Sequence, residues 1–344
     1  MTAAVALAGR RRLLQEELDL IVEAHERYIS GKPGGKRASL RLIDLSGLNL
    51  SGRNLSDADL SASIFDSARM IGTRLDRANL FGCDLRGADL RRAVMVRADL
   101  RGACLKGANL TGADLTQADF REGQVSMPHP SKGLDSVRHE RRGGQIDQAI
   151  LIGAVLDGAQ LNGASAFATD FTDCSLRGAN LTGANLKDAN LQGAMLEGAL
   201  VGGANMENAN FDGAILTGVE MSRARTSGAK LSGCLNEPNA EAVAKGPQML
   251  AMARANHDWC VTGGKSGSPA NFDGADLRPI GEALKGLRLT VLTARGACLV
   301  GMDLTGAQLQ GGNLEGADLR GAVLKACDLR GAKLAGAKIG RAHV

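Results

Sequence analysis

The chain has 344 residues and a net charge of +4, and it combines only 3% aromatic residues with 46 glycines, so large side chains cannot fill an ordinary globular core. Its 41 basic and 37 acidic residues are too evenly balanced to identify a nucleic-acid binder by charge alone. No stretch approaches the roughly 18 apolar residues of a membrane span, and the seven cysteines show no disulfide framework, which together favour a cytoplasmic protein with no membrane span.

Residues 1–37 predict an amphipathic helix followed by a glycine-rich cap. Apolar and aromatic side chains recur on one helical face, at Leu14, Leu18, Ile21, Val22, His25 and Tyr28. The helix is expected to end near Ser30, because Gly31 and Pro33 follow. The basic residues at 10–12 come after a short apolar run, which is the reverse of a signal peptide. We expect the helix to cover open strand edges in the segment that follows.

Residues 38–121 form a first run of repeats with a period of five residues. A large apolar residue occupies every fifth position, at Leu40, Leu45, Leu50, Leu55, Leu60, Phe65, Met70, Leu75, Leu80, Leu85, Leu90, Met95, Leu100, Leu105, Leu110, Leu115 and Phe120. A small residue such as Ala58 or Ala78 usually precedes it by two positions, and Gly often follows by two, as at Gly82. Self-similarity of this density is typical of a solenoid.

A period of five fits neither a helix nor a continuous strand, so each repeat must combine two geometries. The order small, any, large has strand alternation, with the first and third side chains inward and the middle one, commonly Asp or Asn, outward. The other two residues turn a corner, for which Gly is suited because it adopts unusual backbone angles. Repeated strands and corners close into coils that hydrogen-bond to one another at roughly 4.8 Å.

The repeat is interrupted twice. It stops at residues 122–145, resumes over 146–236, stops again at 237–269 and resumes over 270–344. The first interruption contains two prolines and a cluster of basic residues and is expected to be an excursion loop. The phase of residues 278–296 fits two registers.

Three residues depart from the repeat. Arg53 occupies a small inward position, and Ala166 and Thr226 replace the large inward residue. We expect the coils at these positions to be distorted or loosely packed.

The second interruption resembles the amino-terminal segment. Residues 257–276 match residues 25–44 without a gap, with His25 opposite His257 and Gly35 opposite Gly267. The match predicts a helical insertion that acts as a second cap, and hence two solenoid lobes. One continuous solenoid with this helix packed on its flank is the alternative.

Segments such as Ala-Asn-Leu-Thr-Gly at 179–183 and Ala-Asp-Leu-Arg-Gly at 317–321 resemble the motif of the pentapeptide-repeat family of bacterial-type proteins. The resemblance extends over about two thirds of the chain. It implies an all-β solenoid, namely a right-handed quadrilateral β-helix of pentapeptide repeats with four repeats in each coil. Short α-helical caps or insertions complete the expected fold.

The sequence brings together no nucleophile, base and orienting group, so we expect no enzyme, no cofactor and no metal site. Residues 263–266 resemble a phosphate-binding loop, but Trp259 or Cys260 stands where that motif needs Gly. His257 and Cys260 lack a second pair of metal ligands. The recurrent outward acids and amides are expected to hydrogen-bond to the backbone instead of acting as catalysts, at Asp89, Asp99, Asn109, Asn180 and Asn190.

The pattern favours a non-enzymatic protein-interaction or scaffold protein whose rigid surface and loop bind a macromolecule, with another protein as the expected partner. The resemblance also implies a DNA-mimicking, gyrase-binding protein, which fits residues 146–236 with their 9 acidic and 5 basic side chains. A third alternative is a nucleic-acid binder that uses the basic face of the first run, but that run lacks interleaved aromatic residues. The sequence leaves the oligomeric state open.

The candidate partner-binding site is a basic patch made by the first run and the excursion loop. Coils of about twenty residues would align Arg86 with Lys106 and Arg101 with Arg121. The loop would add Lys132, Arg138, Arg141 and Arg142. In the alternative interpretation, Gly133, Gly143 and Gly144 provide no packing and the loop is a disordered, solubilising segment.

Overall fold

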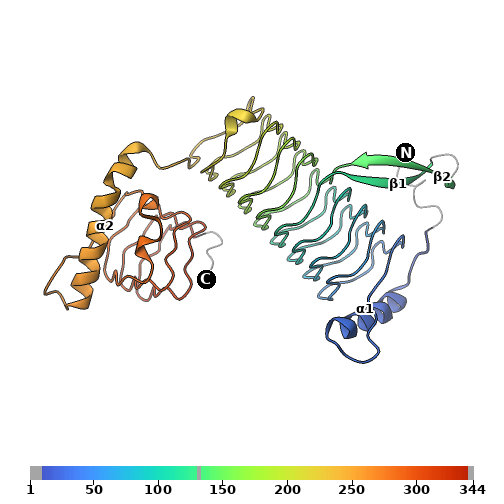
Figure 1. The fold of residues 1–344 in the computed structure, drawn as a ribbon, viewed down its shortest axis with the longest axis horizontal. Coiled ribbons are helices and arrows are strands. Elements are labelled where there is room, and N and C mark those ends of the chain that lie inside the picture. The colour runs from blue at the N-terminus through green and yellow to red at the C-terminus, as the bar shows by residue number, and fades with distance from the viewer. Residues whose placement is uncertain (1–9, 130–132, 340–344) are drawn as a thin grey trace. The chain divides into compact units, whose positions relative to one another are not determined.

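The computed structural model describes residues 10–129 and 133–339, and it describes side chains outside residues 125–139. The chain divides into two compact units, Met1–Asn236 and Glu237–Val344. In each unit a helix is followed by a stack of coils (Figure 1). Within the described ranges, no helix has the length and apolar character that crossing a membrane requires.

The coils of the first unit are built from short strands joined by parallel bridges between residues twenty positions apart, such as Asp59 with Asn79 and Asn79 with Asp99. The Leu60 N–H donates to the Asn79 carbonyl at 2.9 Å, and the Asn79 N–H donates to the Ala58 carbonyl at 2.9 Å. Four five-residue repeats therefore complete one turn. This confirms the predicted all-β solenoid, a right-handed quadrilateral β-helix.

Each strand ends in a corner whose second residue adopts the left-handed backbone conformation. Gly82 has φ of 63°, where a glycine carries no steric penalty. Other residues also occupy this place, including Arg92 at 57° and Asp173 at 55°. The left-handed conformation at the corner is therefore imposed by the coil and does not require glycine. Charged side chains are tolerated there because they point to solvent.

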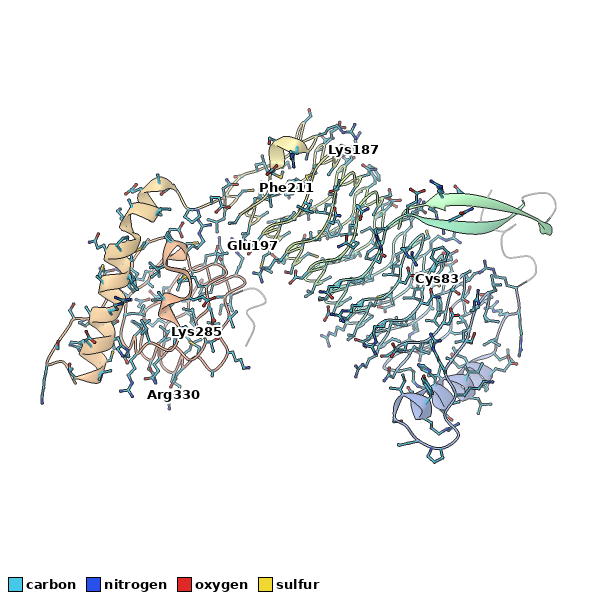
Figure 2. All side chains as sticks on the ribbon, viewed as in Figure 1. Cys83, Lys187, Glu197, Phe211, Lys285 and Arg330 are labelled. Atoms are coloured by element: carbon cyan, nitrogen blue, oxygen red, sulfur yellow. The ribbon has the colours of Figure 1, made fainter. Side chains whose placement is uncertain are left out.

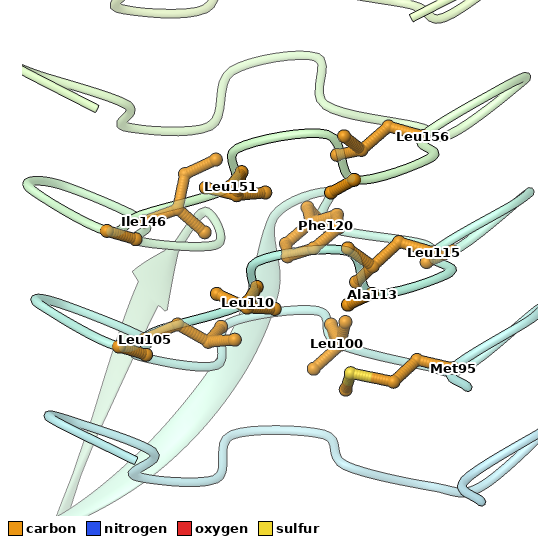
Figure 3. Packing of buried hydrophobic residues seen from close by; sticks show 14 of the residues in the cluster. Met95, Leu100, Leu105, Leu110, Ala113, Leu115, Phe120, Ile146, Leu151 and Leu156 are labelled. Atoms are coloured by element: carbon orange, nitrogen blue, oxygen red, sulfur yellow. The ribbon is translucent and has the colours of Figure 1, made fainter. Parts of the chain in front are cut away.

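The core of the first unit is one continuous column of inward side chains (Figure 3). Leu100, Leu105, Leu110 and Leu115 are completely buried and stack on the equivalent residues of neighbouring coils. Small residues such as Ala113 fill the remaining inward positions. Because one large and one small side chain per strand fill the coil, the chain needs few aromatic residues.

Two of the three expected distortions are absent. Arg53 keeps the regular ladder, since its side chain turns to the first helix and pairs with Glu26 at 3.0 Å. The strand at Ala166 also keeps its ladder, with its N–H donating to Asn185 at 2.8 Å. The strand of Thr226 keeps its ladder too, with Arg225 bridged to Asn205, but the 3₁₀ turn η1 (Met221–Arg223) distorts the same coil just before it.

Helix α1 (Gln15–Ile29) packs against the first coil with Leu18, Val22 and His25 buried. The backbone before the helix already joins the ladder, through a parallel bridge from Arg12 to Asp44. The Gln15 side chain then accepts from the Asn49 N–H at 2.9 Å. Backbone groups of the first coil, which have no preceding coil to bond to, are thus partly satisfied by the cap.

The segment 122–145 was expected to be an excursion loop, and most of it has regular secondary structure. It forms an antiparallel hairpin of β1 (Gly123–His129) and β2 (Gly133–Arg142), in which Gly123 pairs with Arg142. The hairpin projects from the stack in Figure 1. The chain therefore leaves the coil at the start of β1 and re-enters it after β2, at the same corner.

The second unit begins with α2 (Ala240–Val261), whose buried residues are Gly246, Met249, Ala253 and Asn256. Its first coil contains the 3₁₀ segment η2 (Arg278–Leu284). Asn271 therefore stacks on Thr293, two residues more than the usual twenty, whereas Arg288 stacks on Gln308 with the normal spacing. These two extra residues explain why the phase of residues 278–296 was ambiguous. The unit has its own buried core.

Candidate functional site

The candidate site lies at the root of the hairpin, at the corner that follows Phe120. Cys104 stacks on Gln145, forty-one positions later, where twenty is the usual increment. The Leu105 N–H donates to the Gln145 carbonyl at 2.7 Å, so the ladder continues across the insertion. Twenty-one residues are thus inserted without interrupting the stack of coils.

Close contacts fix the hairpin to the coil. A Cβ atom on Gly123 would lie 2.6 Å from a ring carbon of Phe81, and one on Gly144 would lie 2.9 Å from Phe120. The Arg142 guanidinium donates two hydrogen bonds to the Gly102 carbonyl, at 3.0 and 2.6 Å. The expectation that Gly144 provides no packing is therefore wrong, since only glycine fits there.

The register of the predicted basic residues is as expected. The strands of Asp84 and Cys104 are bridged, which aligns Arg86 with Lys106 at the following corners. The bridge between Asp99 and Asp119 aligns Arg101 with Arg121 in the same way. Lys132 and the side chain of Arg138 lie outside the described residues.

The charges at this site are compensated, which the sequence interpretation missed. Four candidate cations form ion pairs with nearby carboxylates: Arg86 with Asp84, Arg101 with Asp99 at 2.6 Å, Lys106 with Asp147 at 3.3 Å and Arg121 with Asp119 at 2.8 Å. Arg141 approaches Glu122 at 4.0 Å, with both side chains exposed. The hydrogen bonds that Arg86 and Arg101 donate to Asp84 and Asp99 raise the pKa values of both guanidinium groups.

An Asp-x-Arg unit explains most of these pairs. The Asp99 carboxylate accepts from the Arg101 backbone N–H at 3.2 Å and from its guanidinium at 2.9 and 2.6 Å. Asn109 makes the same turn with Thr111, accepting from its N–H at 3.0 Å and its hydroxyl at 2.7 Å. These bonds confirm that the outward acids and amides serve the backbone. Their spacing of two residues is visible in the sequence.

The coil side of the site therefore has alternating charge, whereas Arg142 of the hairpin is bound by a backbone carbonyl. Arg101 also lies over the Phe81 ring, with its guanidinium carbon 5.6 Å from the ring centre. Polar side chains of the second run, such as Lys187 and Glu197, likewise stand on the outside of the coils (Figure 2). Such a surface suits a partner that also presents both signs of charge.

Among the described residues, there is no group of three or more His, Cys, Asp or Glu side chains that could hold a metal ion. Burial raises the pKa of the Cys83 thiol to about 12, so this inward cysteine stays protonated. Cys174 is buried in an equivalent inward position. Each thiol donates a hydrogen bond to a backbone carbonyl inside the coil, Cys83 to Leu60 at 3.1 Å and Cys174 to Leu151 at 2.6 Å.

The square coil of five-residue strands defines a β-helical repeat protein. The family model for pentapeptide repeats matches eight copies, over residues 43–80, 78–117, 167–201, 196–233 and 294–342, which is more than half of the chain. The chain therefore belongs to the pentapeptide repeat family. No curated protein matches it.

Solved structures of the same kind are similar to the chain. HetL, a pentapeptide repeat protein involved in heterocyst differentiation regulation from the cyanobacterium Nostoc sp. strain PCC 7120, is 23% identical over 91% of this chain and 92% of its own, with a TM-score of 0.45. Rfr23 from the cyanobacterium Cyanothece 51142 is 30% identical over 40% of this chain and 88% of its own, with a TM-score of 0.28. QnrB1, a plasmid-mediated fluoroquinolone resistance protein, is 17% identical over 61% of this chain and 95% of its own, with a TM-score of 0.39.

Proposed function

We propose that the protein is a non-enzymatic interaction protein that presents the hairpin and its root to another protein. The observation that carries the proposal is the insertion itself, since twenty-one residues leave and re-enter the coil without a change in the ladder. Of the hairpin residues whose side chains are described, none belongs to the hydrophobic core. A segment that the fold does not need, on a rigid support, is typical of a binding element.

The compensated charges at the root support a protein as the partner. A nucleic-acid backbone favours a surface with excess cations, whereas Arg86, Arg101 and Arg121 are each held by an aspartate of the same repeat. A protein with its own mixture of charges matches this pattern better. We therefore place nucleic acid behind protein as the expected partner.

A DNA-mimicking role has weaker support. The second run has more acidic than basic residues, but Arg177 pairs with Glu197 at 3.3 Å and Lys187 with Glu207 at 3.9 Å. A mimic needs an uninterrupted acidic surface along the rod.

An internal deletion tests the proposal. Removing residues 122–142 joins Arg121 directly to Gly143. Arg121 and Gly143 then form the corner, Gly144 is the small inward residue, and Gln145 and Ile146 are the middle and large residues of the next repeat. The deleted chain should keep the parental melting temperature within a few degrees, because its ladder is uninterrupted. It should also lose the proteins that the intact chain captures from its host extract.

A second variant separates the hairpin from its root. Arg142→Ala removes both hydrogen bonds to Gly102 while leaving the strands present, and it should weaken capture without abolishing it. Mass spectrometry of the captured proteins provides the measurement, with the parent and the deletion at equal concentration. Unchanged capture by the deletion would contradict the proposal.

A further inference from the structure

One face of the first unit changes its charge along its length. We call it the Ile150 face: the strands whose outward residues stack, through consecutive parallel bridges, in the order Arg69, Asp89, Asn109, Ile150, Asp170, Asn190 and Asn210, with the corners at both edges. The hairpin leaves at the corner between the strands of Asp119 and Gln145, which borders neither edge of this face. The face shares Lys106 and Asp147 with the candidate site, but the hairpin itself is not part of it.

The first half of the Ile150 face is basic. Arg69 and Arg92 are exposed and form no ion pair with the described residues. Lys106 at the edge is also exposed and reaches Asp147 at 3.3 Å. Arg91, in contrast, is neutralised by Asp89 at 2.6 Å.

The second half is acidic up to Asn210, where the exposed Lys230 continues the column, and Lys187 at its edge pairs with Glu207 at 3.9 Å. Asp170, Asp173, Asp188 and Asp212 form no ion pair with any cation in the described part of the chain. Their recorded partners are neutral: Asp170 accepts from the Thr172 hydroxyl at 2.6 Å, and Asp188 accepts from the Asn208 amide at 3.0 Å. Asp173 and Asp188 are exposed at corners. Four carboxylates thus lie on one side of the rod without compensation.

Apolar side chains occupy the boundary between the two halves. Ile150 and Ile152 are 38% and 39% exposed, and Phe167 on the next coil is 37% exposed. The neighbouring coils have Asn109 and Thr111 on one side and Asp170 and Thr172 on the other, so the repeat itself favours polar residues here. An exposed apolar group bordered by opposite charges is typical of the centre of an interface.

We propose that the Ile150 face binds a second copy of this chain, with the two rods antiparallel. A two-fold axis across the face, between the coils of Asn109 and Ile150, brings together coils at equal distances on its two sides. Arg92 then meets the partner's Asp173, and Lys106 meets the partner's Asp147. A parallel arrangement would oppose like charges, which is unfavourable. Because such an interface is self-complementary, each contact occurs twice.

The dimer is expected to be weak and sensitive to salt. One face of a coil is narrow, so the buried area falls towards the low end of the range for specific interfaces. Exposed ion pairs are screened within roughly 8 Å at physiological ionic strength. We expect dissociation in the range of roughly 10 µM at low salt, rising at least about tenfold in about 0.5 M NaCl.

A charge exchange tests the arrangement in the full chain. Arg92→Asp and Asp173→Arg should each raise the dissociation constant at least about tenfold, because each places like charges together twice. The double variant restores opposite charges and should dimerise nearly as well as the parent. Arg97→Asp is the matched control, since Arg97 is at the same corner position on another edge, with φ of 56°, and it should leave dimerisation unchanged.

The apolar centre is tested by Ile150→Asn with Ile152→Thr, which introduces the residues found at Asn109 and Thr111. This variant should keep the parental melting temperature and lose most of the dimer. Sedimentation velocity from about 5 to 500 µM measures all variants, a range that brackets the expected dissociation constant. A monomeric parent at every concentration overturns the proposal, as does a dimer that is insensitive to both single charge variants, fails to recover in the double variant, or responds equally to Arg97→Asp.

Discussion

Leu100 shows how much stability depends on a single inward residue. It is completely buried, as Leu319 is in the second unit, and Leu181 is 1% exposed. Above and below each of them lies the equivalent side chain of the next coil, so a cavity cannot be filled by local collapse without moving the ladder.

Leu→Ala at position 100, 181 or 319 should therefore lower the free energy of unfolding of its unit by about 2 to 5 kcal/mol. Urea titration followed by circular dichroism measures the loss. Leu200→Ala is the control, because Leu200 is outward and 58% exposed, and it should change stability by no more than about 0.5 kcal/mol. Equal stability of the three inward variants and the parent would show that these positions do not form the core.

The sequence predicts correctly whether a side chain is inward or outward wherever the five-residue repeat determines its position. The period of five placed every large residue from Leu40 to Phe120 correctly, because one inward phase serves all coils. It could not show that Arg53 turns from the coil to Glu26, since that partner belongs to a helix outside the repeat. The spacing of two residues between Asp99 and Arg101 is sufficient to predict that Asp99 neutralises Arg101. A basic patch is predicted only if the outward cations are considered without these neighbouring acids.

At the scale of the element, the two helical caps are similar but not identical. Leu18, Val22 and His25 of α1 correspond to Met249, Ala253 and Asn256 of α2, at an offset of 231 residues. The helix ends and the following loops are offset by 232. The expected match of His25 with His257 is therefore wrong, and the His257 ring accepts from the Arg288 N–H at 3.0 Å instead. A gap of one residue inside a helix is invisible in an ungapped comparison.

His25 makes the first cap sensitive to pH. Its Nδ1 faces the Ala38 N–H at 3.0 Å and must accept, so Nε2 carries the proton and donates to the Ser56 carbonyl at 2.9 Å. Burial lowers the pKa of His25, against the opposing effect of the bond to Ser56. The unfolded chain therefore binds the proton more readily than the folded chain does.

Stability of the first unit should consequently be complete above pH about 6.5, the ordinary histidine value, and should fall as the pH drops from there towards the lower pKa of the folded state. Melts at pH about 7.5 and 5.5 measure the difference. His25→Asn introduces the residue that α2 has at the equivalent position, Asn256, and should reduce the pH dependence. The same pH dependence in both chains would assign it to other groups.

The pairing of β1 with β2 in the hairpin could not be predicted from the sequence. The basic composition of the hairpin and its departure from the repeat are visible in the sequence, but Gly123 pairs with Arg142 nineteen positions away. The fit of Gly144 against Phe120 joins residues 24 positions apart, across the whole hairpin. Contacts of this kind depend on tertiary structure, which local sequence patterns do not encode.

At the scale of the whole molecule, the chain consists of two separate cores. The buried cluster of the first unit ends at Leu216, and that of the second begins at Met249. Each unit has a helix packed on its first coil, which protects the edges that would otherwise bind another chain. The buried residues Met249 and Ala253 are provided by α2 to its own unit.

The fragment 237–344 should therefore fold when expressed alone. It contains α2, its own core and a complete ladder from Asn271 to Lys338, so no backbone partner from the first unit is required. We expect a soluble fragment with a β-rich circular dichroism spectrum and a cooperative melt close to that of the same unit in the full chain. A fragment that begins at residue 270 is the control. It lacks α2, exposes the first coil with Phe272 and Leu277, and should aggregate or unfold at a temperature at least about 10 °C lower. If fragment 237–344 also aggregates while the full chain is stable, the second unit depends on the first, and the chain is one continuous folding unit.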